Sequence, residues 1–446
     1  MKYIIFAMAV FGVPPLAWLM SINRRWMRLA FWCMAGVFCV YQSTSINFFS
    51  REFYRGTSRG METCLIHLLC AAILLSLGFR GRIRKFLPGW GFRLYFIYIL
   101  LCLPSLRTSV SDVYFWCELW KMLLTGLIGL TVYWYLDTTR DVETPVAVLA
   151  AIAIINAISV GWAHFSGAYQ PNGIFPHRNS MAMAMTLIGP VFFAAWLERG
   201  PWSRFGRLCA VAFVCAGFAT FRSLSRGAIV LAPLGYAITA ISCVSERVGS
   251  FFKLRRVAPF LLLGAIGLGA LAHTVIERFE TAPESSGNTR IELAKCAREM
   301  IADEPWRGIG LNNWGMKINA PWPYAERAGR NTNRSAEFQD GIVETVYLLV
   351  AAECGIPALL MMLTWFGWHW AAAFRTARRL RGTRWHFLPA GLLGGFTANY
   401  IQSALEWVLK QPLNMILLMF CFAMTAYLDR NRRILAAEAK EETGRT

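Results

Sequence analysis

The sequence predicts an all-α, polytopic transmembrane helical bundle, and two observations support this fold class. Of the 446 residues, 56% are hydrophobic and only 16% are charged, whereas soluble proteins carry about 25% charged residues. Apolar runs of about 20 residues, the length that crosses a bilayer as a helix, recur along the whole chain. Because these runs are continuous rather than alternating, they favour helices over the strands of a membrane barrel.

The apolar runs indicate about 12–13 membrane spans. The candidate spans are 3–20, 29–49, 62–79, 88–106, 114–136, 144–163, 179–197, 207–221, 227–245, 257–275, 342–372, 386–404 and 413–428. They divide the chain into transmembrane helices over 1–275, one large, partly helical periplasmic loop over 276–341, C-terminal transmembrane helices over 342–428 and a cytoplasmic tail over 429–446. The run at 3–20 has no typical cleavage site, so we expect a retained span rather than a signal peptide.

The net charge of +19 is explained by the short loops between spans, without a nucleic-acid partner. Lys and Arg collect in alternate loops, as the positive-inside bias requires of cytoplasmic loops. The strongly basic loops are 24–28, 80–85, 199–207, 253–256 and 375–384. This assignment places the long loop and the N-terminus outside and the C-terminus inside.

Cysteine and histidine give no sign of a metal site or a cofactor. Nearly all of the 12 cysteines fall inside apolar runs, and no CxxC spacing is present, so they are typical of small buried residues. The six histidines are scattered. We therefore expect neither a disulfide framework nor a bound metal.

Three arginines are predicted near helix starts on the outer side. Arg178 ends the segment Gly-Ile-Phe-Pro-His-Arg before a span, where a helix N-terminus offers free N–H groups to an anion. Arg226 begins a span at membrane depth, which is costly unless it binds a partner or snorkels towards lipid phosphates. Arg290 falls in the first turn of a helix predicted over 288–301 by its apolar spacing. Guanidinium groups match phosphate oxygens bidentately, so these three residues favour an anionic substrate.

Glu344 is the predicted catalytic residue. It stands at the start of the apolar run 342–372, where desolvation can raise the pKa of a carboxylate and let it act as a base. The alternative is a helix-start carboxylate paired with a loop arginine. Together with the arginines, Glu344 suits a lipid-linked pyrophosphate, whose leaving group the arginines would hold while the base takes a proton from an acceptor hydroxyl.

Three further features flank this site. Gly355-Ile-Pro357 interrupts the run 342–372 and predicts a bent helix or a helix pair. The turn 305–314 is rich in glycine but lacks the Lys-Ser/Thr ending of a nucleotide-binding loop. Polar groups at the outer edge of the last two spans are Asn399, Gln402, Glu406, Lys410, Gln411 and Asn414, of which Glu406 and Lys410 are spaced to pair on a helix.

Four segments occur in a characteristic order around the long loop: Gly173–Asn179, Ser225–Ala228, Arg290 with the turn at 305–310, and Tyr347–Pro357. In their order and spacing the chain resembles the O-antigen ligase and O-antigen polymerase superfamily of bacterial surface-polysaccharide enzymes, over roughly residues 150–430. The resemblance implies a GT-C-like fold in the bacterial inner (cytoplasmic) membrane, with the active face periplasmic. It also implies metal-independent transfer of a glycan from undecaprenyl pyrophosphate. By position, Arg226 and Arg290 would bind the pyrophosphate.

One departure from the family pattern affects the base. Family ligases carry His-Asn just before the Tyr-Leu of the span after the loop, and that His is taken as the base or as the group that orients the acceptor. Here the two positions are Glu344-Thr345, so Glu344 would replace the histidine. His164 or His177 is an alternative that could also reach the site.

We therefore expect a membrane glycosyltransferase of lipopolysaccharide or related polysaccharide biosynthesis, without a cofactor. The donor would be an undecaprenyl-pyrophosphate-linked glycan, and the acceptor a hydroxyl of lipid A-core, of another glycan or of a protein. The alternatives are a polymerase of O-antigen or exopolysaccharide and a glycolipid transporter or flippase, which would need alternating access. The predicted site comprises Glu344 as catalytic residue; Arg178, Arg226, Arg290, Asn179 and Ser225 for pyrophosphate; and His177, Asn312, Tyr347 and Glu406 as accessory candidates.

Overall fold

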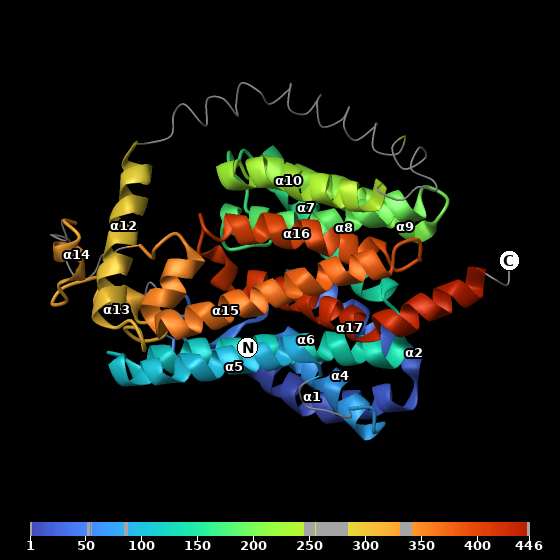
Figure 1. Ribbon diagram of the computed structural model, residues 1–446. Coiled ribbons are helices and arrows are strands. Elements are labelled where there is room, and N and C mark those ends of the chain that lie inside the picture. Colours follow the sequence, from blue (N-terminus) through green and yellow to red (C-terminus); the bar gives the residue numbers. More distant parts are fainter. Residues whose placement is uncertain are drawn as a thin grey trace.

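The computed structural model describes residues 2–50, 54, 56–83, 88–244, 255, 284–330 and 341–443, and they fold almost wholly into helices (Figure 1). The helices are α1 (Lys2–Ile22), α2 (Arg24–Cys39), α3 (Tyr41–Thr44), α4 (Leu65–Phe79), α5 (Trp90–Cys102), α6 (Asp112–Thr139), α7 (Glu143–Phe165), α8 (Arg178–Arg199), α9 (Arg204–Arg222), α10 (Arg226–Val244), α12 (Glu284–Asp303), α13 (Trp314–Lys317), α14 (Tyr324–Arg327), α15 (Val346–Arg379), α16 (Phe387–Gln402) and α17 (Pro412–Thr443). Two 3₁₀ helices are η1 (Leu103–Thr108) and η2 (Val408–Lys410). Strands β1 (Ile46–Phe48) and β2 (Met61–Thr63) pair antiparallel, with Ile46 opposite Thr63.

The predicted fold class is confirmed: the chain is an all-α polytopic helical bundle. Within the described residues, eight helices are long and apolar enough to cross a membrane: α1, α6, α7, α8, α9, α10, α15 and α17. The shorter α4 is also apolar. The predicted span at 257–275 lies outside the described residues.

Two predicted spans were too long. Within the span expected over 29–49, α2 ends at Cys39, and only the short α3 follows before the chain enters β1. The span expected over 88–106 ends as an α-helix at Cys102 and tightens into η1, which has proline at its start. Proline removes a backbone N–H and fits the first positions of a helical turn better than its interior. Both helix ends lie within apolar sequence, so composition alone did not predict them.

Four of the predicted basic loops meet at one end of the bundle; the fifth, 253–256, lies outside the described residues except for residue 255. Arg28 lies 3.6 Å from Asp141, Arg199 lies 2.8 Å from Glu143 and Arg375 lies 3.5 Å from Asp429. Arg80 donates to the carbonyl oxygen of Ser21 at 2.8 Å. These contacts join the ends of helices that the charge pattern had placed on the same side of the membrane.

Helix α8 lies in the interior of the bundle against α9, α10 and α16. The α16 glycines allow this close packing, because a Cβ on Gly395 would stand 2.2 Å from the carbonyl oxygen of Leu187. A Cβ on Gly394 would likewise stand 2.2 Å from the carbonyl oxygen of Gly235 in α10. Small residues let membrane helices approach closely where apolar burial alone gives little attraction.

Helix α15 bends where the sequence predicted a bent helix. Gly355 has φ 84° and ψ 169° inside the helix, a conformation that glycine adopts at little cost. The kink frees backbone groups, and the turn 305–314 satisfies them. Ile309 N–H donates to the Ala352 carbonyl at 2.8 Å, and Ile356 N–H donates to the Pro305 carbonyl at 2.7 Å. The glycine-rich turn therefore docks the extramembrane loop onto the kink.

Helix α12 extends across the ends of the spans, with α13 and α14 beside it (Figure 1). Its apolar stripe packs on the first turns of α15 through Leu293, Ala297 and Met300, although Ile291, predicted in the same stripe, is exposed. The helix begins at Glu284 rather than near Asn288. The expectation that Arg290 lies in its first turn was therefore wrong.

Candidate functional site

One polar cavity of about 220 Å³ opens at the end of the bundle opposite the basic loops. The N-terminus of α8, the turn between α9 and α10, α12, and the segments before α15 and after α16 all contribute to it. Its lining residues are His177, Arg178, Asn179, Leu224, Ser225, Arg226, Gly227, Arg290, Glu344, Leu405 and Glu406. Eight of the ten residues predicted for the site thus share one cavity.

Two helices begin at this cavity. Arg178 is the first residue of α8, and His177 caps that helix by accepting the N–H of Asn179 on its Nδ1 at 3.2 Å. Arg226 is the first residue of α10, after a sharp turn in which Leu224 has φ 50°. Helix N-termini carry partial positive charge and unused N–H groups, so both helix starts add to the attraction of the arginines for an anion.

Arg290 joins the cavity from α12 and contacts two carboxylates. Its Nε forms an ion pair with Glu344, and its Nη2 lies 3.6 Å from Oε1 of Glu406. Asn179 Nδ2 donates to the same Oε1 at 2.8 Å. The pairing of Glu344 with a loop arginine, one of the two alternatives for this residue, is therefore present. Within the described residues, no ion pair or hydrogen bond involves the side chain of Arg226.

Burial and neighbouring charges change the acid–base properties of the cavity. Burial, aided by the Glu344 charge, raises the pKa of Glu406 to about 7 against the opposing effects of Arg290, Asn179 and Arg178. Burial and Arg178 lower the pKa of His177. A carboxyl group with a pKa near 7 can take up or release a proton at neutral pH.

Three candidates lie elsewhere. Tyr347 donates its hydroxyl to the Tyr400 carbonyl at 2.7 Å between two spans, and it does not line the cavity. His164 contacts Arg222 at 2.6 Å through Nδ1 and also lies outside the lining. Asn312, the third, is fully buried in a separate polar network.

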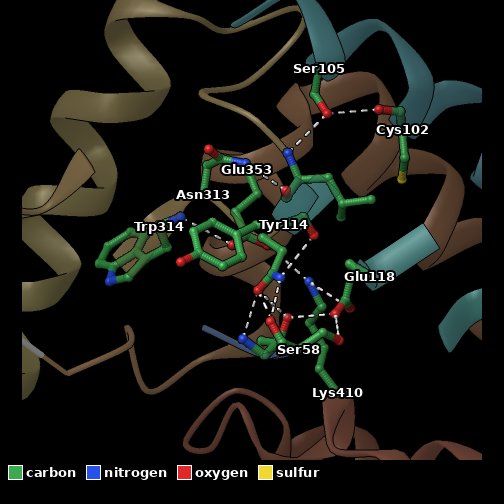
Figure 2. A network of polar contacts seen from close by, with 12 residues as sticks. Ser58, Cys102, Ser105, Tyr114, Glu118, Asn313, Trp314, Glu353 and Lys410 are labelled. Atoms are coloured by element: carbon green, nitrogen blue, oxygen red, sulfur yellow. Dashed lines mark hydrogen bonds and ion pairs between the residues drawn. The ribbon is translucent and has the colours of Figure 1, made fainter. Parts of the chain in front are cut away.

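That network is built around four buried charges (Figure 2). Lys410 Nζ lies 2.9 Å from Glu353 and 3.5 Å from Glu118, and Lys121 lies 2.6 Å from Glu118. We call Glu118, Lys121, Glu353 and Lys410 the buried quartet. The predicted pairing of Lys410 with Glu406 was wrong, because η2 and the kink of α15 turn Lys410 towards Glu353 while Glu406 contacts Arg290 and Asn179.

Asn312 connects the quartet to the loop before α4. Its Oδ1 accepts the N–H of Thr57 at 2.8 Å, and its Nδ2 donates to the Ser58 carbonyl at 2.8 Å. Ser58 and Thr57 in turn donate their hydroxyls to Glu118 at 2.6 and 2.7 Å. The described residues of this loop therefore serve the buried network and not the arginine cavity.

Sequence reasoning missed Glu118, Lys121 and Glu353. A signal was available, because all three are charged residues inside apolar runs, and such residues are expensive in a membrane unless they pair with one another. What the sequence did not reveal was their common location.

A second group of side chains lies at the opposite end of the bundle. Glu198, Cys243 and His386 place one potential metal-ligand atom each within 4.8 Å of one another, and His386 Nδ1 lies 3.2 Å from Glu198 Oε1. These residues are too far apart in the sequence for a spacing motif to reveal them. They are remote from the arginine cavity and take no part in its chemistry.

Comparison with known proteins finds one matching family model. A family model described as O-antigen ligase matches residues 211–363, a stretch that contains Arg226, Arg290 and Glu344. None of the curated proteins compared with the chain matches it.

Proposed function

We propose that this chain, which belongs to the O-antigen ligase and O-antigen polymerase superfamily, is a membrane glycosyltransferase that uses a polyprenyl-pyrophosphate-linked donor. The observation that carries the proposal is the arginine cavity. Three guanidinium groups from three separate elements and two helix N-termini face two carboxylates there. The excess of positive charge suits a pyrophosphate diester, which carries two negative charges.

The residues of the cavity divide into two roles. Arg226 and Arg290, with Arg178, Asn179 and Ser225, bind the pyrophosphate and stabilise the charge that develops when it leaves. Fixed donors directed at a developing charge are a large source of catalytic rate enhancement. A carboxylate of the cavity accepts the proton of the acceptor hydroxyl, and the sequence assigns this role to Glu344. The arginines supply positive charge where other transferases use a metal ion.

The site lies at the outer face of the membrane in this proposal. The cavity opens opposite the basic loops, which the positive-inside bias assigns to the cytoplasm. A donor anchored in the bilayer by its polyprenyl chain would reach the cavity from the side, and the acceptor would approach from the periplasm of a bacterial inner membrane. Lipid A-core is the acceptor that we propose to test first.

The test uses purified protein in proteoliposomes, with labelled undecaprenyl-pyrophosphate oligosaccharide and lipid A-core, in buffer containing EDTA. Wild type should form a labelled lipid A-core product, and Arg226→Ala and Arg290→Ala should form little. The exposed Glu326→Gln is the matched surface control. Unchanged activity in both arginine variants would refute the assignment of the cavity.

The same assay distinguishes the alternatives. Longer lipid-linked chains in place of a lipid A-core product would identify a polymerase. Movement of the donor across the bilayer without any new glycosidic bond would identify a transporter and contradict the proposed transfer.

A further inference from the structure

The two carboxylates of the arginine cavity stand in different environments. Glu406 follows α16 and is only 7% exposed. Within the described part of the chain, both of its polar contacts involve Oε1: the 2.8 Å hydrogen bond from Asn179 and the 3.6 Å approach of Arg290. Its second oxygen, Oε2, is therefore the one left for a substrate.

Glu344 is held differently. Its carboxylate forms a direct ion pair with Nε of Arg290, and about a third of its side chain is exposed to solvent. This carboxylate is therefore engaged by an arginine, whereas the described residues place no such partner on Oε2 of Glu406. The same contact fixes the orientation of the planar guanidinium group, whose geometry decides how it meets a phosphate.

We infer that Glu406 is the proton acceptor of the transfer reaction and that Glu344 is a positioning residue that holds Arg290 towards the pyrophosphate. This inference rests on the proposed function. It reassigns the base that the sequence alone had placed at Glu344.

The electrostatic environment supports the assignment. The pKa of Glu406 is about 7 because its carboxylate is buried and lies near a second carboxylate. A general base works best when its pKa is close to the operating pH. The titratable and charged groups that share the cavity with Glu406 are His177, Arg178, Arg226, Arg290 and Glu344.

The step balances without another reactant. The acceptor hydroxyl oxygen attacks the anomeric carbon of the donor sugar, and its proton passes to Oε2 of Glu406. The bond between the anomeric carbon and the pyrophosphate oxygen breaks, and the pyrophosphate leaves with the electron pair into the field of the arginines. Glu406 then releases its proton to water, which restores the carboxylate.

The experiment compares Glu406→Gln, Glu344→Gln and the surface control Glu326→Gln in the proteoliposome assay, with kcat measured from pH 5 to 9. Glu406→Gln should lower kcat by about 10²–10⁴-fold and should leave the Kd of the labelled donor within a few-fold. Glu344→Gln should weaken donor binding. The kcat of this variant should still fall at low pH, where Glu406 becomes protonated. This acid limb of the kcat profile should lie at lower pH than in wild type, because the neighbouring charge that raises the pKa of Glu406 is gone.

Two measurements separate a catalytic from a structural effect. Asn179→Ala removes a hydrogen bond that favours ionised Glu406, so its acid limb should move to higher pH. Donor binding and the unfolding midpoint of Glu406→Gln report whether that variant is folded, and Glu406→Asp should recover part of kcat. If Glu406→Gln is misfolded, the other two variants decide the result: the acid limb should move to lower pH in Glu344→Gln and to higher pH in Asn179→Ala.

The outcomes distinguish the inference from the proposed function. The inference would be overturned if Glu406→Gln is as active as an active wild type, or if the acid limb disappears only in Glu344→Gln. Either result would leave the proposed transferase function standing. A wild type that forms no glycosidic product with any acceptor would instead refute the proposed function, and the inference with it.

Discussion

Replacing Lys410 by Met should destabilise the fold strongly, although Lys410 lies outside the arginine cavity. Its ammonium group lies 2.9 Å from Glu353 and 3.5 Å from Glu118, and all three side chains are at least nine-tenths buried. At an effective dielectric constant of about 20, each of these attractions is worth about 5 kcal/mol. Desolvation of the ammonium group offsets much of that sum, so the net contribution is far smaller.

The cost of the substitution comes from the partner left behind. Lys410→Met leaves two buried carboxylates with only Lys121, and removal of one member of a buried ion pair costs about 3–5 kcal/mol. Adding Glu353→Gln removes the uncompensated charge and leaves Glu118 paired with Lys121. The double variant should therefore be more stable than Lys410→Met alone.

Most of the 12 cysteines are buried, so reaction with a thiol-specific dye reports unfolding. We would titrate SDS into mild detergent and compare both variants with wild type and with Lys295→Met, an exposed lysine on α12. If Lys410→Met unfolds at the same SDS fraction as Lys295→Met, the quartet does not stabilise the fold. If the double variant is the least stable, the reasoning about the uncompensated charge is wrong.

Three further predictions concern the cavity and the kink. Arg290→Ala should weaken binding of the labelled donor by roughly 2–5 kcal/mol, and Arg290→Lys should restore little because a point charge does not reproduce the guanidinium fork; equal donor affinity in Arg290→Ala and wild type would contradict this. Gly355→Ala should lower the unfolding free energy by about 1–3 kcal/mol, because its Cβ would stand 2.6 Å from the Trp306 carbonyl oxygen, whereas Gly367→Ala on the same helix meets nothing within 4 Å and should have little effect in the same SDS titration. The pKa of Glu406 is raised from 4.5 to about 7, so native protein binds more protons than unfolded protein between these values, and stability should fall as pH rises through this window; unfolding at pH 5 and pH 8 should show a smaller fall for Glu406→Gln, and an identical fall would count against the raised pKa.

Sequence patterns located much of the arginine cavity because short connections between spans restrict where helix ends can lie. Arg178 and Arg226 each begin a span, and the predicted alternation of loops placed both helix starts on the same side, so this pattern alone predicted that they share one surface. The kink at Gly355 was also predictable, since glycine and proline together interrupt a membrane helix. In both cases the signal is local and depends on a few adjacent residues.

The remaining features depend on contacts between distant segments. Glu118 and Lys410 are far apart in the sequence, and sidedness does not decide which helix ends are neighbours. The raised pKa of Glu406 depends on its burial and on the approach of Glu344 from another segment, which together outweigh the opposing charge of Arg290. The start of α12 was placed too late for a different reason, because the apolar spacing that predicted the helix begins only at Ile291.

The buried quartet and the arginine cavity are mechanically connected through α15. The loop 305–314 docks on the kink of α15 beside Glu353, and α12 packs on the first turns of the same helix through Leu293 and Leu349. Glu344 precedes those turns directly, so the kink and its docked loop set the distance between Glu344 and Arg290. A loss of the quartet should therefore reach the cavity as a misplaced arginine. In Lys410→Met protein that remains folded, donor affinity should fall and the acid limb of the kcat profile should shift, because Arg290 and Glu344 both act on the pKa of Glu406; an unchanged donor affinity and acid limb would contradict the connection.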